Sequence, residues 1–170
     1  MKIALIDIDG VLNHYPQCWI DYINDQLKTD FRTLEQCKKE ILPNTYADLK
    51  RQYRNSDYKA NLPVKDDGAS LVLRLKQRGY DVFLVTSRPI SDPNYPNLLP
   101  LTERWLRKNS ISYREIIEKK SLRMSLDSLL KRNTIKKVVC VDDDMEDLVK
   151  MMDVLEGFNV LQCAYFNYSR

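Results

Sequence analysis

The chain has 170 residues, 44% of them hydrophobic and 30% charged, and its net charge is +3. These values are typical of a globular protein of one domain, with room for a small insertion. The small net charge does not demand a nucleic-acid partner, and no apolar run approaches the roughly 18 residues that a membrane span needs. The four cysteines form no C-x-x-C pair, which argues against a zinc site or a disulfide scaffold, so we expect a cytoplasmic protein.

The first predicted element is a buried strand over residues 3–8, which stops at Asp9 and Gly10. Side chains two positions apart in a strand point to the same side. The pattern therefore places the carboxylates of Asp7 and Asp9 together at the carboxyl end of the strand, where α/β folds bind ligands. Two like charges this close require a cation or a shared proton.

Residues 13–65 interrupt the alternation of strands and helices that the rest of the chain shows. This segment is too long for a loop and too short for an ordinary domain. We predict that it forms a small helical cap over the site, and that residues 1–12 and 66–170 form the catalytic core. Three helices are expected within the cap, over residues 17–28, 33–42 and 45–54.

Aromatic and basic side chains in the cap favour a substrate with a ring and a phosphate. Tyr15 and Trp19 open the cap and are candidates to stack on a base. Lys50, Arg51 and Arg54 are candidates to contact a phosphate. We therefore predict that the cap sets the specificity and that a nucleotide is the preferred substrate.

Beyond the cap, strands and amphipathic helices alternate. Apolar runs predict strands over 80–86 and 137–141, and weaker ones over 113–117 and 159–163. Apolar periodicity predicts helices around residues 71–78, 101–106, 122–130 and 148–155. Continuous apolar runs suit strands that helices cover on both faces. The predicted fold class is therefore α/β, a three-layer, Rossmann-like core around a mostly parallel sheet.

Two further strand ends carry polar residues that could bind a phosphate or a cation. In the run Thr86-Ser87-Arg88, hydroxyls and backbone N–H groups at a strand-to-loop turn, followed by a guanidinium, are suited to a phosphate. Residues 142–144 are three successive aspartates. The dipole of a following helix explains one or two of these acids, but three are costly without a cation.

The order of these motifs resembles that of the haloacid dehalogenase superfamily of phosphohydrolases. The pattern consists of Asp7-Ile-Asp9-Gly10, a strand ending in Thr86-Ser87, a lysine, and finally an acidic pair. The resemblance covers the whole chain. Within the superfamily, the Thr-Ser-Arg-Pro run and the acidic pair look most like 5′-nucleotidases and the phosphatase half of polynucleotide kinase–phosphatases.

The resemblance implies roles for the first two motifs. Asp7 matches the nucleophile that forms an aspartyl-phosphate, and Asp9 matches the general acid and base. Thr86 matches the hydroxyl that holds the phosphoryl oxygens, with the N–H of Ser87 beside it. Arg88 matches an arginine that such phosphatases place after the second motif. The acid at position 9 also implies cleavage of phosphate esters rather than carbon–halogen bonds.

The acidic pair implies a magnesium site. Asp142 and Asp143 match the pair, with Asp143 favoured as the direct ligand and Asp142 as its support. Asp7 and the backbone carbonyl of Asp9 complete the set of ligands that the resemblance implies. An all-oxygen set of this kind suits Mg²⁺, which is the cofactor we expect.

The lysine of the pattern follows the weak strand over 113–117, where Lys119 and Lys120 both fit. Lys120 is preferred as the catalytic lysine, and Lys119 is then expected to contact the substrate phosphate. Arg123 and Lys131 remain possible, because the polynucleotide-phosphatase pattern places its lysine after an arginine and an acid.

Together these observations predict a Mg²⁺-dependent phosphomonoester hydrolase that acts on a small phosphorylated substrate, preferably a nucleotide. The alternatives are a polynucleotide 3′-phosphatase and a phosphatase of other small metabolites. A different class, a non-catalytic phosphate-binding or receiver-like signalling domain, is disfavoured, because receivers place their acid pair near the first strand and lack a cap. We expect no membrane partner and no stable nucleic-acid complex, although a nucleic-acid end remains possible as a substrate.

Overall fold

The computed structural model describes residues 1–132, 134–156 and 161–166. Within these residues, five strands form one wholly parallel sheet with the order β3-β2-β1-β4-β5. The sheet confirms the predicted fold class, and every predicted strand is present to within a few residues. The strands are β1 (Lys2–Asp7), β2 (Tyr80–Thr86), β3 (Glu115–Glu118), β4 (Lys137–Asp142) and β5 (Leu161–Phe166).

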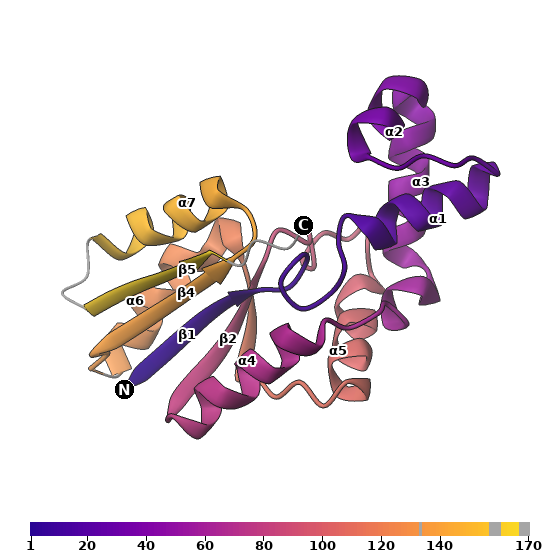
Figure 1. Cartoon of the computed structure of the whole chain (residues 1–170). Helices are drawn as coiled ribbons and strands as arrows, with labels where there is room; N and C mark the ends of the chain where they lie inside the picture. Colours follow the sequence, from indigo (N-terminus) through magenta and orange to yellow (C-terminus); the bar gives the residue numbers. More distant parts are fainter. Residues whose placement is uncertain (133, 157–160, 167–170) are drawn as a thin grey trace.

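Helices cover both faces of the sheet (Figure 1). Ala4 and Ile6 of β1 share one apolar cluster with residues of the first two core helices, whereas Ile3 and Leu5 share the other cluster with residues of the last two. This alternation follows from the two-residue period of a strand, and it explains why β1 is apolar throughout. The core helices are α4 (Asp66–Gln77), α5 (Leu98–Lys108), α6 (Leu122–Arg132) and α7 (Met145–Glu156).

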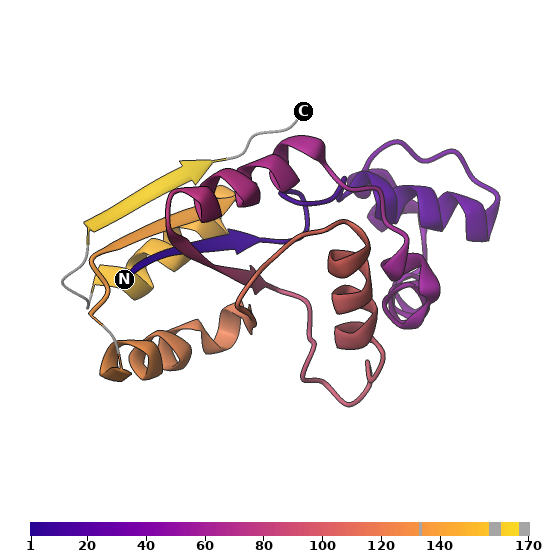
Figure 2. The ribbon, with the colours of Figure 1, turned by 90° about the horizontal axis from the view of Figure 1, so that it is seen from below.

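The inserted segment lies beyond the carboxyl ends of the strands (Figure 2). Its entry and exit meet where the backbone N–H of Lys65 donates to the carbonyl of Leu12 over 2.9 Å. The segment rests on α5 of the core, because the indole N–H of Trp105 donates to the carbonyl of Leu62 over 2.8 Å. Its elements are α1 (Gln17–Leu27), α2 (Leu34–Glu40), α3 (Pro43–Asn55) and the short 3-10 helix η1 (Asp57–Ala60).

Aromatic side chains form the interior of this segment. The ring of Trp19 lies 5.9, 5.5 and 4.9 Å from those of Tyr22, Tyr46 and Tyr53, measured between centroids. Its indole N–H donates to the hydroxyl of Tyr46 over 2.9 Å. Trp19 is fully buried. The rings pack together with buried aliphatic residues such as Ile20, Ile23 and Leu49, and the small helical unit thereby obtains a core of its own.

No helix in the described part of the chain combines the length and the apolar character that crossing a bilayer requires.

Candidate active site

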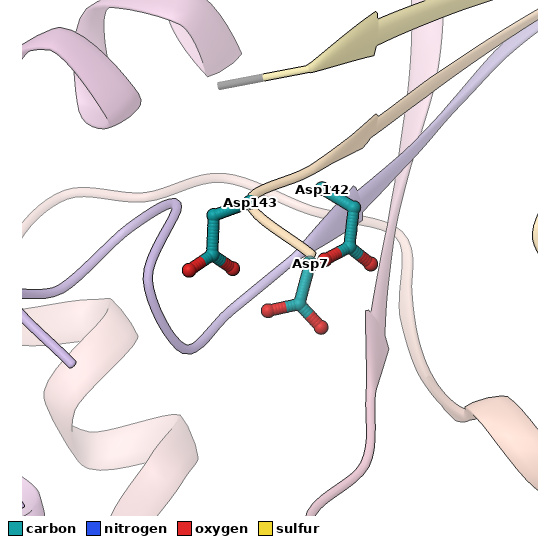
Figure 3. A group of neighbouring side chains, drawn as sticks. All are labelled: Asp7, Asp142 and Asp143. Atoms are coloured by element: carbon teal, nitrogen blue, oxygen red, sulfur yellow. The ribbon is translucent and has the colours of Figure 1, made fainter. Parts of the chain in front are cut away.

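The carboxyl end of β1 meets the carboxyl end of β4, and both strands end in an aspartate. Asp7 closes β1 with its side chain 6% exposed, and Asp142 closes β4 with its side chain 1% exposed. Asp143 follows directly. Figure 3 shows the carboxylates of Asp7, Asp142 and Asp143 gathered at this end of the sheet. The parallel pairing of β1 with β4 is what brings residues from opposite ends of the sequence together.

These three acids fit a hard divalent cation. One carboxylate oxygen from each of Asp7, Asp142 and Asp143 lies within 4.8 Å of the others, and oxygen ligands are those that Mg²⁺ prefers. Burial, together with the charge of Asp142, raises the pKa of Asp143 to about 6. Asp143 makes no ion pair with any residue that the structure describes. A cation would supply the missing positive charge.

Gly10 makes room for the Asp143 side chain. Its φ of +91° is a left-handed conformation that residues with a Cβ rarely adopt, and a Cβ placed there would overlap the carboxylate of Asp143. Lys65 holds the same turn from the other side, since its buried ammonium donates to the Gly10 carbonyl over 2.9 Å. The turn after β1 therefore positions a residue of the acidic pair.

We expect the substitution Gly10→Ala to weaken cation binding, because the new methyl group must displace the Asp143 carboxylate. The matched control is Gly79→Ala, since Gly79 also has a positive φ (+78°), but a Cβ added there would meet no atom of the described residues within 4 Å. Both variants should lose some stability from backbone strain. We expect added Mg²⁺ to raise the melting temperature of the wild type and of Gly79→Ala, but not that of Gly10→Ala. An equal rise in both variants would contradict this assignment.

Lys119 is the lysine that enters the acid cluster. Its Nζ lies 2.9 Å from Asp7, 2.8 Å from Asp142 and 2.6 Å from Asp147. Burial opposes the charged form of Lys119. The charge of Asp7, together with the hydrogen bonds from Lys119 to Asp142 and Asp147, nevertheless raises the pKa of Lys119 above the ordinary value. Burial also raises the pKa of Asp7 well above its usual range, although Lys119 opposes the rise. Lys119 therefore enters the acid cluster as a cation.

The preference for Lys120 as the catalytic lysine does not agree with this geometry. Lys120 is exposed, and its Nζ lies 2.5 Å from Glu118 and 3.3 Å from the hydroxyl of Ser91. The short 3-10 helix η2 (Lys119–Ser121) turns the two neighbouring lysines to different sides. The other candidates, Arg123 and Lys131, are exposed on α6 and do not line the site.

Asp9 is held by an arginine. Its carboxylate accepts two hydrogen bonds of 2.7 Å from the Arg88 guanidinium, a third of 2.8 Å from the side chain of Asn13, and lies 3.6 Å from the ammonium of Lys59. Burial alone would raise the pKa of Asp9, but the charges of Arg88 and Lys59 and these hydrogen bonds hold it well below its ordinary value. Asp9 is therefore an anion with a fixed orientation.

Three of these partners were not predicted as site residues. Asn13 follows the apolar run of β1 and its turn, and gives no local signal. Thr102 lies inside α5, and its hydroxyl accepts a 2.8 Å hydrogen bond from Arg88. Asp147 lies in the first turn of α7, where an acid is expected for reasons of helix dipole alone.

The end of β2 contributes Thr86 and Ser87. Thr86 is buried, and its hydroxyl accepts the backbone N–H of Arg88 over 3.1 Å. Ser87 is exposed and lines the same cavity as Asp7. Ser87 therefore reaches the cavity, whereas Thr86 does not line it, and the predicted contact between Thr86 and the phosphoryl oxygens stays a prediction.

A cavity of about 210 Å³ lies between the acid cluster and the inserted segment. Tyr15 lines it, as its candidate role requires. Trp19 does not, because it is buried in the aromatic interior of the cap and cannot stack on a ligand. The cavity-lining residues from the inserted segment are Tyr15, Lys50, Tyr53, Arg54 and Lys59.

No protein-family model and no curated protein matches the sequence. Solved structures do match. A hydrolase from Streptococcus pneumoniae TIGR4 superposes with a TM-score of 0.62 at 12% identity, over 98% of this chain and 92% of that one. The HAD domain of the effector protein Lem4 from Legionella pneumophila gives a TM-score of 0.52 at 14% identity, over 99% and 86% of the two chains.

A chain of the Pnkp1/Rnl/Hen1 RNA repair complex is also similar, with a TM-score of 0.50 and 18% identity over 98% of this chain. This chain spans only 43% of the length of that one. At such low identities the likeness establishes the fold. The chain therefore has the fold of a HAD domain, which confirms the fold that the resemblance implied.

Proposed function

We propose that this protein is a Mg²⁺-dependent phosphomonoester hydrolase with Asp7 as its nucleophile. The observation that carries the proposal is the position of Asp7, a buried carboxylate that lines a cavity with Lys119 on one side and Arg88 close by. A phosphate ester that enters this cavity meets an anionic nucleophile and cations that match its own charge. The hydrolase fold of the similar structures agrees with this chemistry.

In the proposed reaction, a carboxylate oxygen of Asp7 attacks phosphorus, and the ester oxygen departs with a proton from Asp9. Asp9 then takes a proton from water, whose oxygen attacks the aspartyl-phosphate, and this step releases phosphate and restores Asp7. An incoming phosphoryl group competes with Asp9 for Arg88. Weakening of that ion pair would raise the pKa of Asp9 toward the value that a proton donor needs.

The remaining site residues bind the phosphoryl group and neutralise the charges of the acids. Ser87 and Arg88 hold the phosphoryl oxygens and Thr86 shapes their turn, whereas Lys119 takes the role expected of Lys120 and keeps the acids in place. Asp7, Asp143 and the backbone carbonyl of Asp9 would hold Mg²⁺, with Asp142 in support. The bound ion would supply positive charge to the phosphoryl oxygens.

We propose a nucleotide as the substrate class and residues 13–65 as the cap that selects it. Tyr15 supports this proposal, because it presents a ring at the cap side of the cavity.

Cys18 and Cys37 are buried free thiols, which agrees with a reducing compartment and the proposed cytoplasmic location.

The function is tested by phosphate release from a panel of substrates with and without Mg²⁺. The panel contains an aryl phosphate, a deoxynucleoside monophosphate, a 3′-phosphorylated oligonucleotide and a sugar phosphate. Release from at least one substrate is expected, with the highest kcat/KM for the nucleotide. Preference for the sugar phosphate would overturn the nucleotide proposal, and no release from any substrate would favour a non-catalytic binding domain.

We also expect activity to vanish with a chelator and to return with Mg²⁺. The variant Asp143→Ala should need a higher Mg²⁺ concentration for half-maximal activity, because it loses a proposed ligand. Asp144→Ala is the matched control. The exposed Asp144 accepts the backbone N–H groups of Glu146 and Asp147, so its loss should cost about 1 kcal/mol of stability and leave the Mg²⁺ requirement unchanged. An equal increase in the Mg²⁺ concentration needed for half-maximal activity in both variants would argue against Asp143 as a ligand.

A further inference from the structure

The cap wall of the cavity carries two cations that the proposed reaction does not use. Lys50 and Arg54 lie four residues apart on α3, and both line the cavity. This spacing places two side chains on the same face of a helix, where like charges repel each other. An anion bound between them would remove that repulsion.

Within the residues that the structure describes, neither Lys50 nor Arg54 has a carboxylate partner within 4.0 Å. The next residue along the helix shows the contrast, because Arg51 is exposed and pairs with Asp48 over 2.8 Å. The cap therefore neutralises a cation on its outer surface and leaves two cations unneutralised on its cavity side.

Aromatic rings hold both side chains in place. The ammonium of Lys50 lies 4.3 Å from the ring centroid of Trp19 and 5.1 Å from that of Tyr15, and the guanidinium of Arg54 lies 5.0 Å from that of Tyr95. Rings orient a cation but do not cancel its charge. Burial and the charge of Arg54 lower the pKa of Lys50 to about 8. Lys50 is therefore still mostly charged at pH 7.

The reacting end of the cavity already has its own cations. Arg88 and Lys59 lie 2.7 and 3.6 Å from Asp9, and Lys119 lies 2.9 Å from Asp7. These three serve the acids and the phosphoryl group that Asp7 would attack. The positive charge on α3 is therefore additional to what one phosphoryl group requires.

On the basis of the proposed phosphatase function, we propose that Lys50 and Arg54 bind a second phosphate group of the substrate, separate from the one that is hydrolysed. The substrate class is then a nucleoside that carries two phosphates. A nucleoside 3′,5′-bisphosphate has this chemistry, and so does the 3′-phosphorylated end of an oligonucleotide, whose adjacent phosphodiester supplies the second anion. The cavity of about 210 Å³ is smaller than typical ligand pockets, so a longer strand would extend into solvent.

The test compares kcat/KM for a nucleoside 3′,5′-bisphosphate, the two corresponding monophosphates and a dinucleotide with a 3′-phosphate. Charge-assisted hydrogen bonds to the second phosphate should favour the doubly phosphorylated substrates by about 10- to 100-fold. The substitutions Lys50→Met and Arg54→Gln should reduce this ratio toward 1, and Lys50→Arg should retain most of it. Arg51→Gln, the matched control, should leave the ratio at the wild-type value.

Binding provides a second measurement that does not depend on turnover. In the Asp7→Asn background, the bisphosphate should raise the melting temperature more than either monophosphate, and Lys50→Met should abolish the difference. A larger effect for the dinucleotide than for the bisphosphate would identify a nucleic-acid end as the source of the second phosphate. Equal kcat/KM and equal thermal shifts for singly and doubly phosphorylated ligands would overturn the proposal, whereas phosphate release from no substrate would overturn the proposed function alone.

Discussion

Replacement of Asp7 by asparagine should reduce phosphate release by at least about 10³-fold, because a neutral amide cannot act as the attacking anion. The amide has nearly the same shape as the carboxylate and still accepts a hydrogen bond from Lys119. Burial raises the pKa of Asp7 well above its usual range, which means that a buried charge at this position is costly. The metal-free variant should therefore unfold at a temperature no lower than that of the wild type.

The control for Asp7→Asn is Asp81→Asn. Asp81 belongs to the same sheet but lies near the start of β2, half-exposed, where it pairs with Arg114 over 2.9 Å. A surface ion pair of this kind contributes little to stability, and its loss should leave activity close to the wild-type value. Turnover by Asp7→Asn at the wild-type rate would show that Asp7 is not the nucleophile.

Lys119→Met should produce the second large effect. The substitution leaves Asp7 and Asp142 buried together without their shared cation, and Asp147 loses the same partner. We expect phosphate release to fall by at least about 10²-fold. The free energy of unfolding of the metal-free protein should fall by on the order of 3 kcal/mol. Because Mg²⁺ would replace part of the lost charge, it should stabilise this variant more than it stabilises the wild type.

The neighbouring substitution Lys120→Met is the control that distinguishes the two lysines. Lys120 is exposed and pairs with Glu118 outside the acid cluster, so activity should stay within about twofold of the wild type and stability within about 1 kcal/mol. Phosphate release and urea unfolding, measured on both variants, show which of the two lysines belongs to the site. Loss of activity in Lys120→Met but not in Lys119→Met would reverse the assignment made from the geometry.

Much of the architecture could be predicted because the signals are local. An apolar run bounded by Gly or Asp indicates a buried strand, and three such runs, over 3–8, 80–86 and 137–141, became β1, β2 and β4. The two weaker predictions became the edge strands β3 and β5. The positions of Asp7, Asp142 and Arg88 also followed, because parallel strands bring their carboxyl ends to one edge. Residues far apart in the chain were thus expected at one site from topology alone.

Other features depend on contacts that no local pattern contains. Lys119 and Lys120 are the same residue type, one position apart after the same strand, and only the turn of η2 sends one toward Asp7 and the other toward Glu118. Tyr15 and Trp19 are both aromatic residues at the start of the cap, but packing with Tyr22, Tyr46 and Tyr53 buries the tryptophan.

The sequence therefore determines the alternation of strands and helices and the residue types at each strand end, since both depend on side-chain periodicity and backbone propensity. It does not determine which polar groups pair across the cavity. Arg88 reaches Asp9 across 79 positions of the chain, and α3 presents Lys50 and Arg54 to the cavity while Arg51 faces away. Such pairings arise only when the folded chain brings charges within a few ångströms of each other, where burial strengthens their interaction.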